Sequence, residues 1–381
     1  MNFDWVGLQT FMVAQLIGAV QHVAAHHPRD HIYAASVTDI YAERMLVLWP
    51  SICVSSVESL PPQHGTHDPR WDPAEWRWQF DASPEGDEWA GRVTAYAGSK
   101  GQDWDDVVAQ FLDAIASACA RATSALLADP PGALEDGFVI VPINGNPELI
   151  ERSLDAAQLQ HCFPVLSRRR TEILRLHRLP PGDRVDELVA TLRDSPVHGE
   201  GFVLAAELST EIGADAADAL AVHVHAESRN PTADFGRLLG MLAVIEDIGQ
   251  PTTTVTDRLV AVLSDPQVDT VLRAAAGETL AWLGRLAEIA KHLDGLPGEL
   301  ALNCAARPYI GDRKNGALDY GPWETVLELH PDFDGQLFGR LSPNVMFEIN
   351  AADLTTAMDA LSSPWRVIRR HAAIVILSTH L

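Results

Sequence analysis

Prolines and glycines recur at an almost constant interval between residues 196 and 284. The prolines lie 35 residues apart (231 − 196 and 266 − 231), at Pro196, Pro231 and Pro266. The glycines lie 36 and 35 residues apart, at Gly213, Gly249 and Gly284. Proline lacks the N–H that continues a helix, and glycine commonly follows a helix end. A fixed period of this length, with helix, proline turn and helix inside it, predicts a repeat of stacked helical pairs.

The third copy of the repeat has the clearest helical pattern. Val255, Leu259, Val262 and Leu263 fall on one face of a helix ahead of Pro266. A second helix follows and ends at Gly284, and its predicted buried face holds Val268, Val271, Leu272, Ala275, Ala276, Thr279, Leu280 and Leu283. We therefore expect Leu272 and Leu280 to be buried between neighbouring helices.

This copy resembles a HEAT repeat. The resemblance rests on Asp265-Pro266 followed by Val271, Arg273, Ala274, Ala275, Leu280 and Gly284. It implies an all-α, HEAT-like solenoid over residues 183–381, a family used mostly as a scaffold for other macromolecules. The next proline is due at position 301, which is Ala301, so we expect an irregular segment at about 305–350. The pattern returns at Leu354, Ala357, Met358 and Leu361, followed by Pro364.

The first 160 residues predict an α+β domain with a small antiparallel sheet. Residues 3–25 and 104–127 have helical spacing of apolar residues, and Asp103 suits the start of the second helix. Residues 32–37 and 45–49 predict an antiparallel pair of strands, and further strands are expected at 89–96 and 138–141. Residues 58–88 predict a long loop, and residues 161–182 a junction between the two parts.

The first part also resembles a known family. The features shared with it are a helix ending at His26-His27-Pro28, a hairpin, the segment Arg70-Trp71-Asp72-Pro73-Ala74-Glu75-Trp76, and a late Glu148-Leu149-Ile150-Glu151. Over about residues 5–160 they resemble the bacterial domain of unknown function numbered four-three-zero-three. That family has no established reaction, so the resemblance transfers no catalytic residue. It implies only a loose association with bacterial toxin–immunity neighbourhoods.

The charge balance limits the classes of partner that the protein is expected to bind. The chain has 28 Lys and Arg against 52 Asp and Glu, a formal net charge of −24. Such a surface repels phosphate backbones and anionic lipids, so we expect neither a nucleic-acid nor a membrane partner. The acidity either serves solubility or attracts a protein partner with a basic surface. Four scattered cysteines and an N-terminus without a basic segment predict a cytoplasmic protein with reduced thiols.

A short tryptophan segment is the best candidate for partner binding. Trp71, Trp76 and Trp78 occur beside Asp72 and Glu75, and aromatic residues flanked by acids suit a basic, partly apolar surface. The alternative is that the segment folds onto its own sheet and that the tryptophans belong to the core.

Histidines suggest a metal site, but the pattern does not support one. His22 and His26 are four residues apart on a helix, with His27 and His31 nearby, and His64, His67 and Asp68 follow in the loop. Carboxylates and cysteines at ligand spacing are missing from the first cluster, so we expect no metal and no cofactor. Motifs of nucleophilic catalysis or phosphate binding are also missing from the sequence, so no catalytic residue is predicted.

Three functional hypotheses follow. The first is a non-catalytic cytoplasmic protein-binding protein, in the form of an immunity protein that blocks a basic toxin. The second is a HEAT-like scaffold or adaptor. The third is an enzyme with an unrecognised site in the N-terminal domain. A monomer is favoured over an oligomer.

Overall fold

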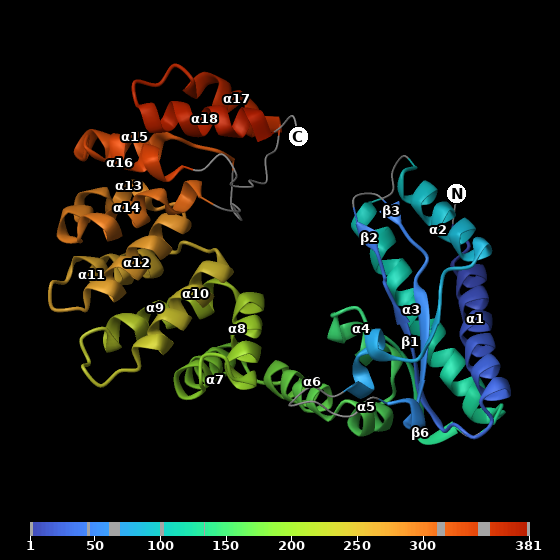
Figure 1. Cartoon of the computed structure of the whole chain (residues 1–381). Coiled ribbons are helices and arrows are strands. Elements are labelled where there is room, and N and C mark those ends of the chain that lie inside the picture. Colours follow the sequence, from blue (N-terminus) through green and yellow to red (C-terminus); the bar gives the residue numbers. More distant parts are fainter. Residues whose placement is uncertain are drawn as a thin grey trace. The chain divides into compact units, whose positions relative to one another are not determined.

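The computed structural model describes residues 3–43, 46–60, 69–99, 103–132, 134–310, 317–341 and 351–378. The chain divides into two compact units, residues 1–172 and 173–381 (Figure 1). The first unit combines helices with a small sheet, and the described part of the second is helical throughout. The division falls inside residues 161–182, the predicted junction, most of which is helical.

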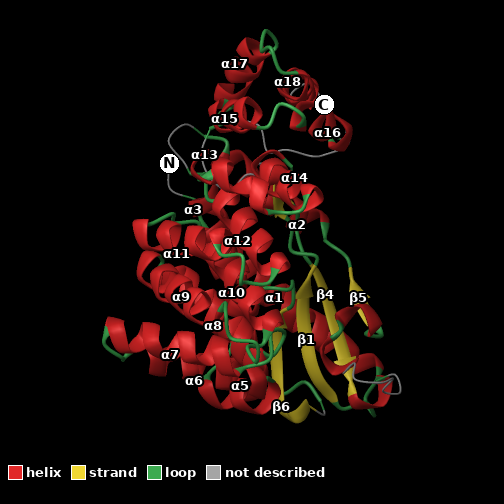
Figure 2. Cartoon of the chain, turned by 90° about the vertical axis from the view of Figure 1, so that its left-hand side faces the viewer, coloured by secondary structure: helices red, strands yellow, loops and turns green. Residues whose placement is uncertain are grey.

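The first unit is built around a mixed four-stranded sheet with the order β5-β4-β1-β6 (Figure 2). β1 pairs antiparallel with β4 and parallel with β6, and β4 pairs antiparallel with β5. A separate short hairpin joins β2 and β3. The strands are β1 (Ile32–Thr38), β2 (Ala42–Glu43), β3 (Leu46–Val47), β4 (Ser51–Ser56), β5 (Trp78–Phe80) and β6 (Leu134–Pro142). The helices are α1 (Trp5–His26), α2 (Pro84–Ala97), α3 (Trp104–Ala128), α4 (Pro147–Ser153) and α5 (Ala156–Cys162), and α6 (Pro164–His177) spans the division between the units.

This sheet corrects several expectations. It is mixed and not antiparallel, because the long connection through α3 lets β6 return parallel to β1. The partner of β1 is β4, whereas residues 46–47 pair with β2, and residues 44–45 lie outside the described part. Residues 89–96 belong to α2, whose buried Ala90, Val93 and Ala97 have helical spacing. The predicted loop at 58–88 contains the edge strand β5.

The two faces of the sheet differ in chemistry. Side chains alternate along a strand, so Val37, Ile52 and Val54 point to one face and join the core beneath α1 and α3. On β6 the opposite face carries Val139 and Val141, which pack with Leu154 and Leu159. On the other three strands it carries small or polar side chains, and this part is called the polar face: Ala34, Ser36, Thr38, Ser51, Cys53, Ser55 and Gln79. By length and composition α1 and α3 could each cross a membrane, and in the fold they pack against each other.

The second unit consists of consecutive helical pairs. Its helices are α7 (Pro181–Asp194), α8 (Glu200–Ile212), α9 (Ala214–Glu227), α10 (Phe235–Ile248), α11 (Thr253–Ser264), α12 (Thr270–Trp282), α13 (Leu286–Ile289), α14 (Gly298–Ala306), α15 (Gly321–Leu329), α16 (Phe333–Arg340), α17 (Ala351–Ala360) and α18 (Arg366–Ser378). The 3₁₀ helix η4 (Ala290–Gly295) extends α13. The second helices of the pairs form one layer, since α8, α10, α12, α14, α16 and α18 each contact the next in this series (Figure 1).

The expected glycine stops are confirmed by the backbone. Gly213, Gly249 and Gly284 all have positive φ, of 78°, 70° and 79°. Leu272 and Leu280 are buried, as expected. Val271 is half exposed, so its placement on the buried face was wrong.

The expectation of an irregular segment at 305–350 is corrected by α15 and α16. A proline lies between the two helices of every pair, and after Pro266 these prolines are Pro297, Pro331 and Pro364. The intervals are 31, 34 and 33 residues (297 − 266, 331 − 297 and 364 − 331), so the strict period fails although the pairing continues. The fourth pair is short because α13 spans four residues and passes directly into η4. Residues 311–316 and 342–350 lie outside the described part.

The last pair corrects one further detail. Of the expected buried face of α17, Ala357 is buried, whereas Met358 and Leu361 are exposed. α18 buries Ile374 and Val375 and packs on both α17 and α16. Part of the apolar end of the chain is therefore covered within its own unit.

We expect Gly284→Ala to lower the free energy of unfolding by about 1–2 kcal/mol, the cost of a left-handed conformation for an L-residue. Steric crowding does not contribute to this loss, because an added Cβ at Gly284 would meet no atom within 4 Å. Gly335 in α16 is the matched control: it has equally open surroundings, and its φ is not positive. Gly335→Ala should raise stability by up to about 1 kcal/mol, because alanine favours a helix. Urea unfolding followed by circular dichroism measures both; equal effects of the same sign would contradict the backbone argument.

Candidate functional site

Two of the three tryptophans, Trp71 and Trp76, lie on the polar face of the sheet. Trp76 is only 3% exposed, packs with Ala34 and Cys53, and its Nε1 donates to the carbonyl of Pro69 at 3.3 Å. Trp71 is half-buried, with its ring 4.2 Å from that of Phe163. Trp76 is therefore a core residue and not an exposed anchor.

The remaining candidates of this segment do not share one surface. Trp78 lies in β5 and packs with the core on the other face of the sheet, with its ring 5.0 Å from that of His27. Asp72 caps the 3₁₀ helix η3 (Pro73–Glu75), where its Oδ1 accepts from the N–H of Ala74 at 3.1 Å. Glu75 is exposed. Whether these residues meet a partner remains a prediction.

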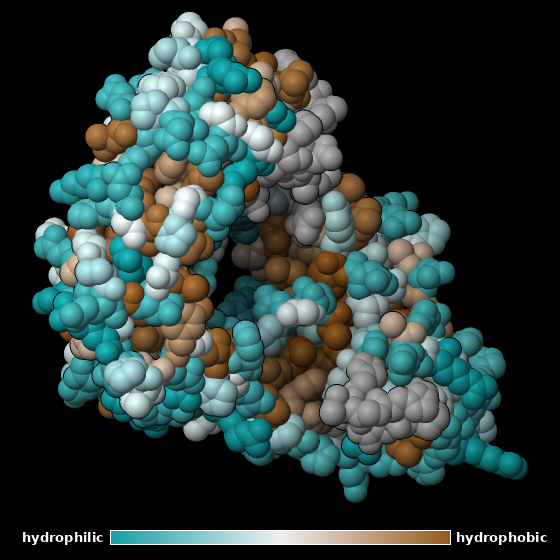
Figure 3. All heavy atoms as spheres, turned by 60° about the vertical axis from the view of Figure 1, so that its left-hand side comes forward, coloured by the Kyte–Doolittle hydropathy of each residue, from teal (hydrophilic) through white to brown (hydrophobic). Residues whose placement is uncertain are grey.

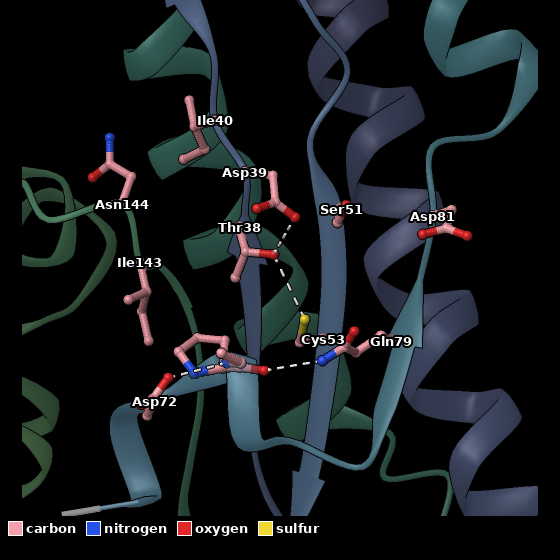
Figure 4. Close-up of a pocket in the computed structure, with 12 residues that line it drawn as sticks. Thr38, Asp39, Ile40, Ser51, Cys53, Asp72, Gln79, Asp81, Ile143 and Asn144 are labelled. Carbon is pink, nitrogen blue, oxygen red and sulfur yellow. Dashed lines mark hydrogen bonds between the residues drawn. The ribbon is translucent and has the colours of Figure 1, made fainter. Parts of the chain in front are cut away.

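A pocket of about 590 Å³ opens on the polar face, where β1 and β6 end (Figure 4). We call it the sheet pocket. It lies between the strand ends and η3, and Figure 4 shows Thr38 and Cys53 pointing toward each other from neighbouring strands. Its lining residues are Thr38, Asp39, Ile40, Ser51, Cys53, Asp72, Pro73, Ala74, Gln79, Asp81, Ile143 and Asn144.

The sequence makes this space by placing small side chains on one face. Ser51-Ile52-Cys53-Val54-Ser55 alternates small polar residues with apolar ones, and the register places Thr38 opposite Ser51. Trp76 covers Ala34 and Cys53, and beyond it the small side chains leave the face open. The carboxyl ends of neighbouring parallel strands are a common location for ligand sites in α/β proteins. The alternation could have indicated this face from the sequence.

The chemistry of the sheet pocket is acidic. Asp39, Asp72 and Asp81 line it, and none of its described lining residues is Lys, Arg or His. Asp39 has φ of 53°, a left-handed conformation that aspartate tolerates better than most residues. Burial raises the pKa of the Cys53 thiol, so this sulfur stays protonated at neutral pH and is a poor nucleophile. The pocket is equipped to accept hydrogen bonds from a cation.

The histidine cluster is arranged differently from a metal site. The rings of His22 and His26 stack at 4.2 Å, and His31 pairs with Glu58. Among the described residues, no group of three His, Cys, Asp or Glu side chains could hold a metal ion. His64, His67 and Asp68 lie outside the described part.

His31 and Glu58 are expected to titrate as a pair. Nδ1 of His31 lies 2.6 Å from Oε1 of Glu58, and the backbone N–H of His31 donates to Oε2 at 2.7 Å. This contact raises the pKa of His31 above 6.5 and lowers the pKa of Glu58 to about 2. The pairing stabilises the fold fully between about pH 4.5 and 6.5. It is lost as the pH rises through the raised pKa of His31 or falls through the lowered pKa of Glu58.

Nuclear magnetic resonance of the His31 ring protons measures this titration. The midpoint in the wild type should lie above 6.5, and Glu58→Gln should lower it toward that value. Glu85→Gln, an exposed acid on α2, is the control and should leave the midpoint unchanged. An unshifted midpoint in Glu58→Gln would show that the pair is not formed in solution.

In the second unit, a row of polar contacts crosses the layer of second helices. We call it the polar row, and its members are Glu246, Glu278, Thr279, Trp282, Asn303, Arg307 and Arg340. Glu246 of α10 accepts from Thr279 of α12 at 2.9 Å and from Arg307 at 2.7 Å. The guanidinium of Arg307 lies 4.5 Å from the ring centre of Trp282, and Arg340 of α16 bonds Asn303 of α14. Burial raises the pKa of Glu278 within this row.

Comparisons of the chain with protein-family models, with curated proteins and with solved structures found no match. The two resemblances therefore remain predictions from the residues quoted for them. The polar row and the sheet pocket, taken by themselves, are the basis for assigning function.

Proposed function

We propose that the second unit is a HEAT-like solenoid that binds a protein partner, and that the protein acts by binding and not by catalysis. The observation that carries the proposal is the unbroken series of second helices from α8 to α18, in which each helix contacts the next. Stacked pairs that contact only their neighbours produce extended surfaces, and proteins of this kind use those surfaces for binding.

The polar row supplies residue types that are common in protein interfaces. Trp282 and Arg307 are half-buried and stacked, and Trp and Arg are the residue types that most often dominate the energy of protein interfaces. Glu246 holds Arg307 in place, so the pair is ordered before a partner arrives. In Figure 3, hydrophilic residues predominate on the visible surface of the helical unit, with apolar residues scattered among them. Such a mixture suits a partner that also exists free in water.

The charge of the unit favours a basic partner. Residues 173–381 hold 17 Lys and Arg against 29 Asp and Glu, a net charge of −12 (17 − 29). Complementary charge speeds association and penalises acidic competitors. The partner would be a toxin if the protein serves immunity, and any basic protein if it serves as a scaffold or adaptor in the cytoplasm. If the protein serves immunity, binding should abolish the activity of the partner. If it is a scaffold or adaptor, binding should leave that activity intact.

Affinity capture with matched variants tests the proposal. The wild type should capture a basic protein from its own cells, and Trp282→Ala should lose it, with circular dichroism confirming that the variant is folded. Val222→Ser, an exposed change in α9 among the first helices, should capture as well as the wild type. Capture should weaken as salt is raised, because exposed charges are screened. Equal capture by both variants, or none by the wild type, would overturn the assignment.

A further inference from the structure

We propose that the sheet pocket binds a small aliphatic amine. Its volume of about 590 Å³ lies in the range of small-molecule sites, and its lining combines carboxylates with an apolar wall. The apolar wall consists of Ile40, Pro73, Ala74 and Ile143, which would contact the methylene groups of a ligand. This site belongs to the first unit and is independent of the proposed protein-binding role of the second.

A buried hydroxyl, that of Thr38, lines the sheet pocket and has two hydrogen-bond partners. Thr38 is only 8% exposed. Its Oγ1 lies 3.5 Å from Oδ2 of Asp39 and 3.6 Å from Sγ of Cys53. The contact with Asp39 is longer than a typical O–H···O bond of about 2.7–2.8 Å. A hydroxyl oxygen has two acceptor lone pairs besides its one O–H, so Thr38 Oγ1 can also accept a hydrogen bond from a donor in the pocket.

The arrangement of the carboxylates favours an organic cation over a metal ion. Asp39 follows β1, Asp72 precedes η3, and Asp81 follows β5, so the acids come from three separate segments. In the described part of the chain they do not form a set of three ligands close enough for one ion. An ammonium group carries three N–H donors, and it can bond Thr38 Oγ1 and the Asp39 carboxylate while its chain extends along the apolar wall.

The charge of the lining points to the same class of ligand. Asp39 and Asp81 face no Lys, Arg or His among the described lining residues, so the pocket itself leaves the charge of these two carboxylates uncompensated. A neutral polyol would donate hydrogen bonds to Thr38 and the carboxylates but would leave the negative charge uncompensated, and an anion would be repelled. An amine would both donate hydrogen bonds to these groups and compensate the negative charge.

Isothermal titration calorimetry of the full chain tests this with 1,5-diaminopentane as the probe and 1,5-pentanediol as its neutral counterpart. Salt at about 150 mM screens loose attraction to the acidic surface. We expect one diamine to bind per chain and the diol not to bind. Asp39→Asn should weaken the binding about tenfold or more, the size expected for the loss of a charge-assisted hydrogen bond. Asparagine tolerates the left-handed backbone at this position, so the variant should fold.

Two further variants complete the test. Thr38→Val removes the hydroxyl at nearly constant side-chain shape and should also weaken binding of the diamine. Circular dichroism confirms that the variant is folded. Asp87→Asn removes an exposed carboxylate of α2 outside the pocket and should leave the affinity unchanged. Equal weakening by Asp39→Asn and Asp87→Asn would mean that the diamine meets only the general acidic surface. That result, equal binding of the diol, or no binding of the diamine would overturn the proposal.

Discussion

Replacing Trp323 by alanine is expected to lower the free energy of unfolding by about 3–5 kcal/mol. Trp323 lies in α15 and is fully buried in the core of the second unit. Its ring stacks on Tyr309 with the centroids 3.9 Å apart, and its Nε1 donates to the carbonyl of Ala305 at 2.7 Å. Truncation removes this contact area, opens a cavity and leaves the Ala305 carbonyl without this donor.

Urea unfolding monitored by circular dichroism measures the loss. Leu329→Ala is the matched control, because Leu329 lies in the same helix and is 55% exposed. It should change stability by no more than about 0.5 kcal/mol. Trp323→Phe should fall between the two, since it restores part of the ring but not the hydrogen bond to Ala305. If Trp323→Ala behaved like Leu329→Ala, the core around α15 would not form in solution.

The position of Trp323 shows how far periodicity predicts this fold. The helical pairs that have a proline between their helices and a glycine after the second helix, such as α11 and α12, were predicted. Proline and glycine at these positions reflect local requirements of the backbone. α15 and α16 were predicted as irregular because the register was extended at a constant period. The next proline, Pro297, lies four residues before position 301, where the constant period placed it. Because this proline was missed, Pro331 was not recognised as the following member of the series. A search that allowed the interval to vary by a few residues would have found both.

The sheet was less predictable for a different reason. Residues 32–37 predicted a strand from local composition, but its partners are chosen by packing between distant segments. β4 begins at Ser51 and β6 at Leu134, and nothing local to β1 (Ile32–Thr38) indicates that both of them pair with it. β5 has three residues, too few for a clear alternation.

The sheet pocket follows from these pairings. Thr38, Cys53 and Asn144 become neighbours only when β1 lies between β4 and β6. Asp72 was selected for its position beside tryptophans, and it does line the pocket, though as the N-terminal cap of η3. Trp76 was selected as an exposed anchor, but its ring covers the small side chains of the polar face. Composition alone cannot distinguish a tryptophan that binds a partner from one that covers its own sheet.

The buried Arg273 joins two neighbouring helical pairs, and its removal is expected to lower the free energy of unfolding by about 3–6 kcal/mol. Arg273 lies in α12 and is 9% exposed. Its Nε donates to the carbonyl of Leu263, near the end of α11, at 2.9 Å. Its Nη2 donates to the carbonyl of Gly295, at the end of η4, at 2.7 Å. Each hydrogen bond from a charged group contributes about 1.5–3 kcal/mol, and both would be lost in Arg273→Met.

The same measurement of urea unfolding applies, with Arg258→Met as the control because Arg258 is exposed on α11. Arg273→Lys should recover little, since one ammonium cannot reproduce the fork that reaches both carbonyls. Gly295→Ala should destabilise in the same direction, because its Cβ would lie 2.8 Å from Nη2 of Arg273. Equal stability of Arg273→Met and Arg258→Met would show that the two carbonyls find other partners. Loss in Arg273→Met and Gly295→Ala together would locate the coupling of the third and fourth pairs at this guanidinium.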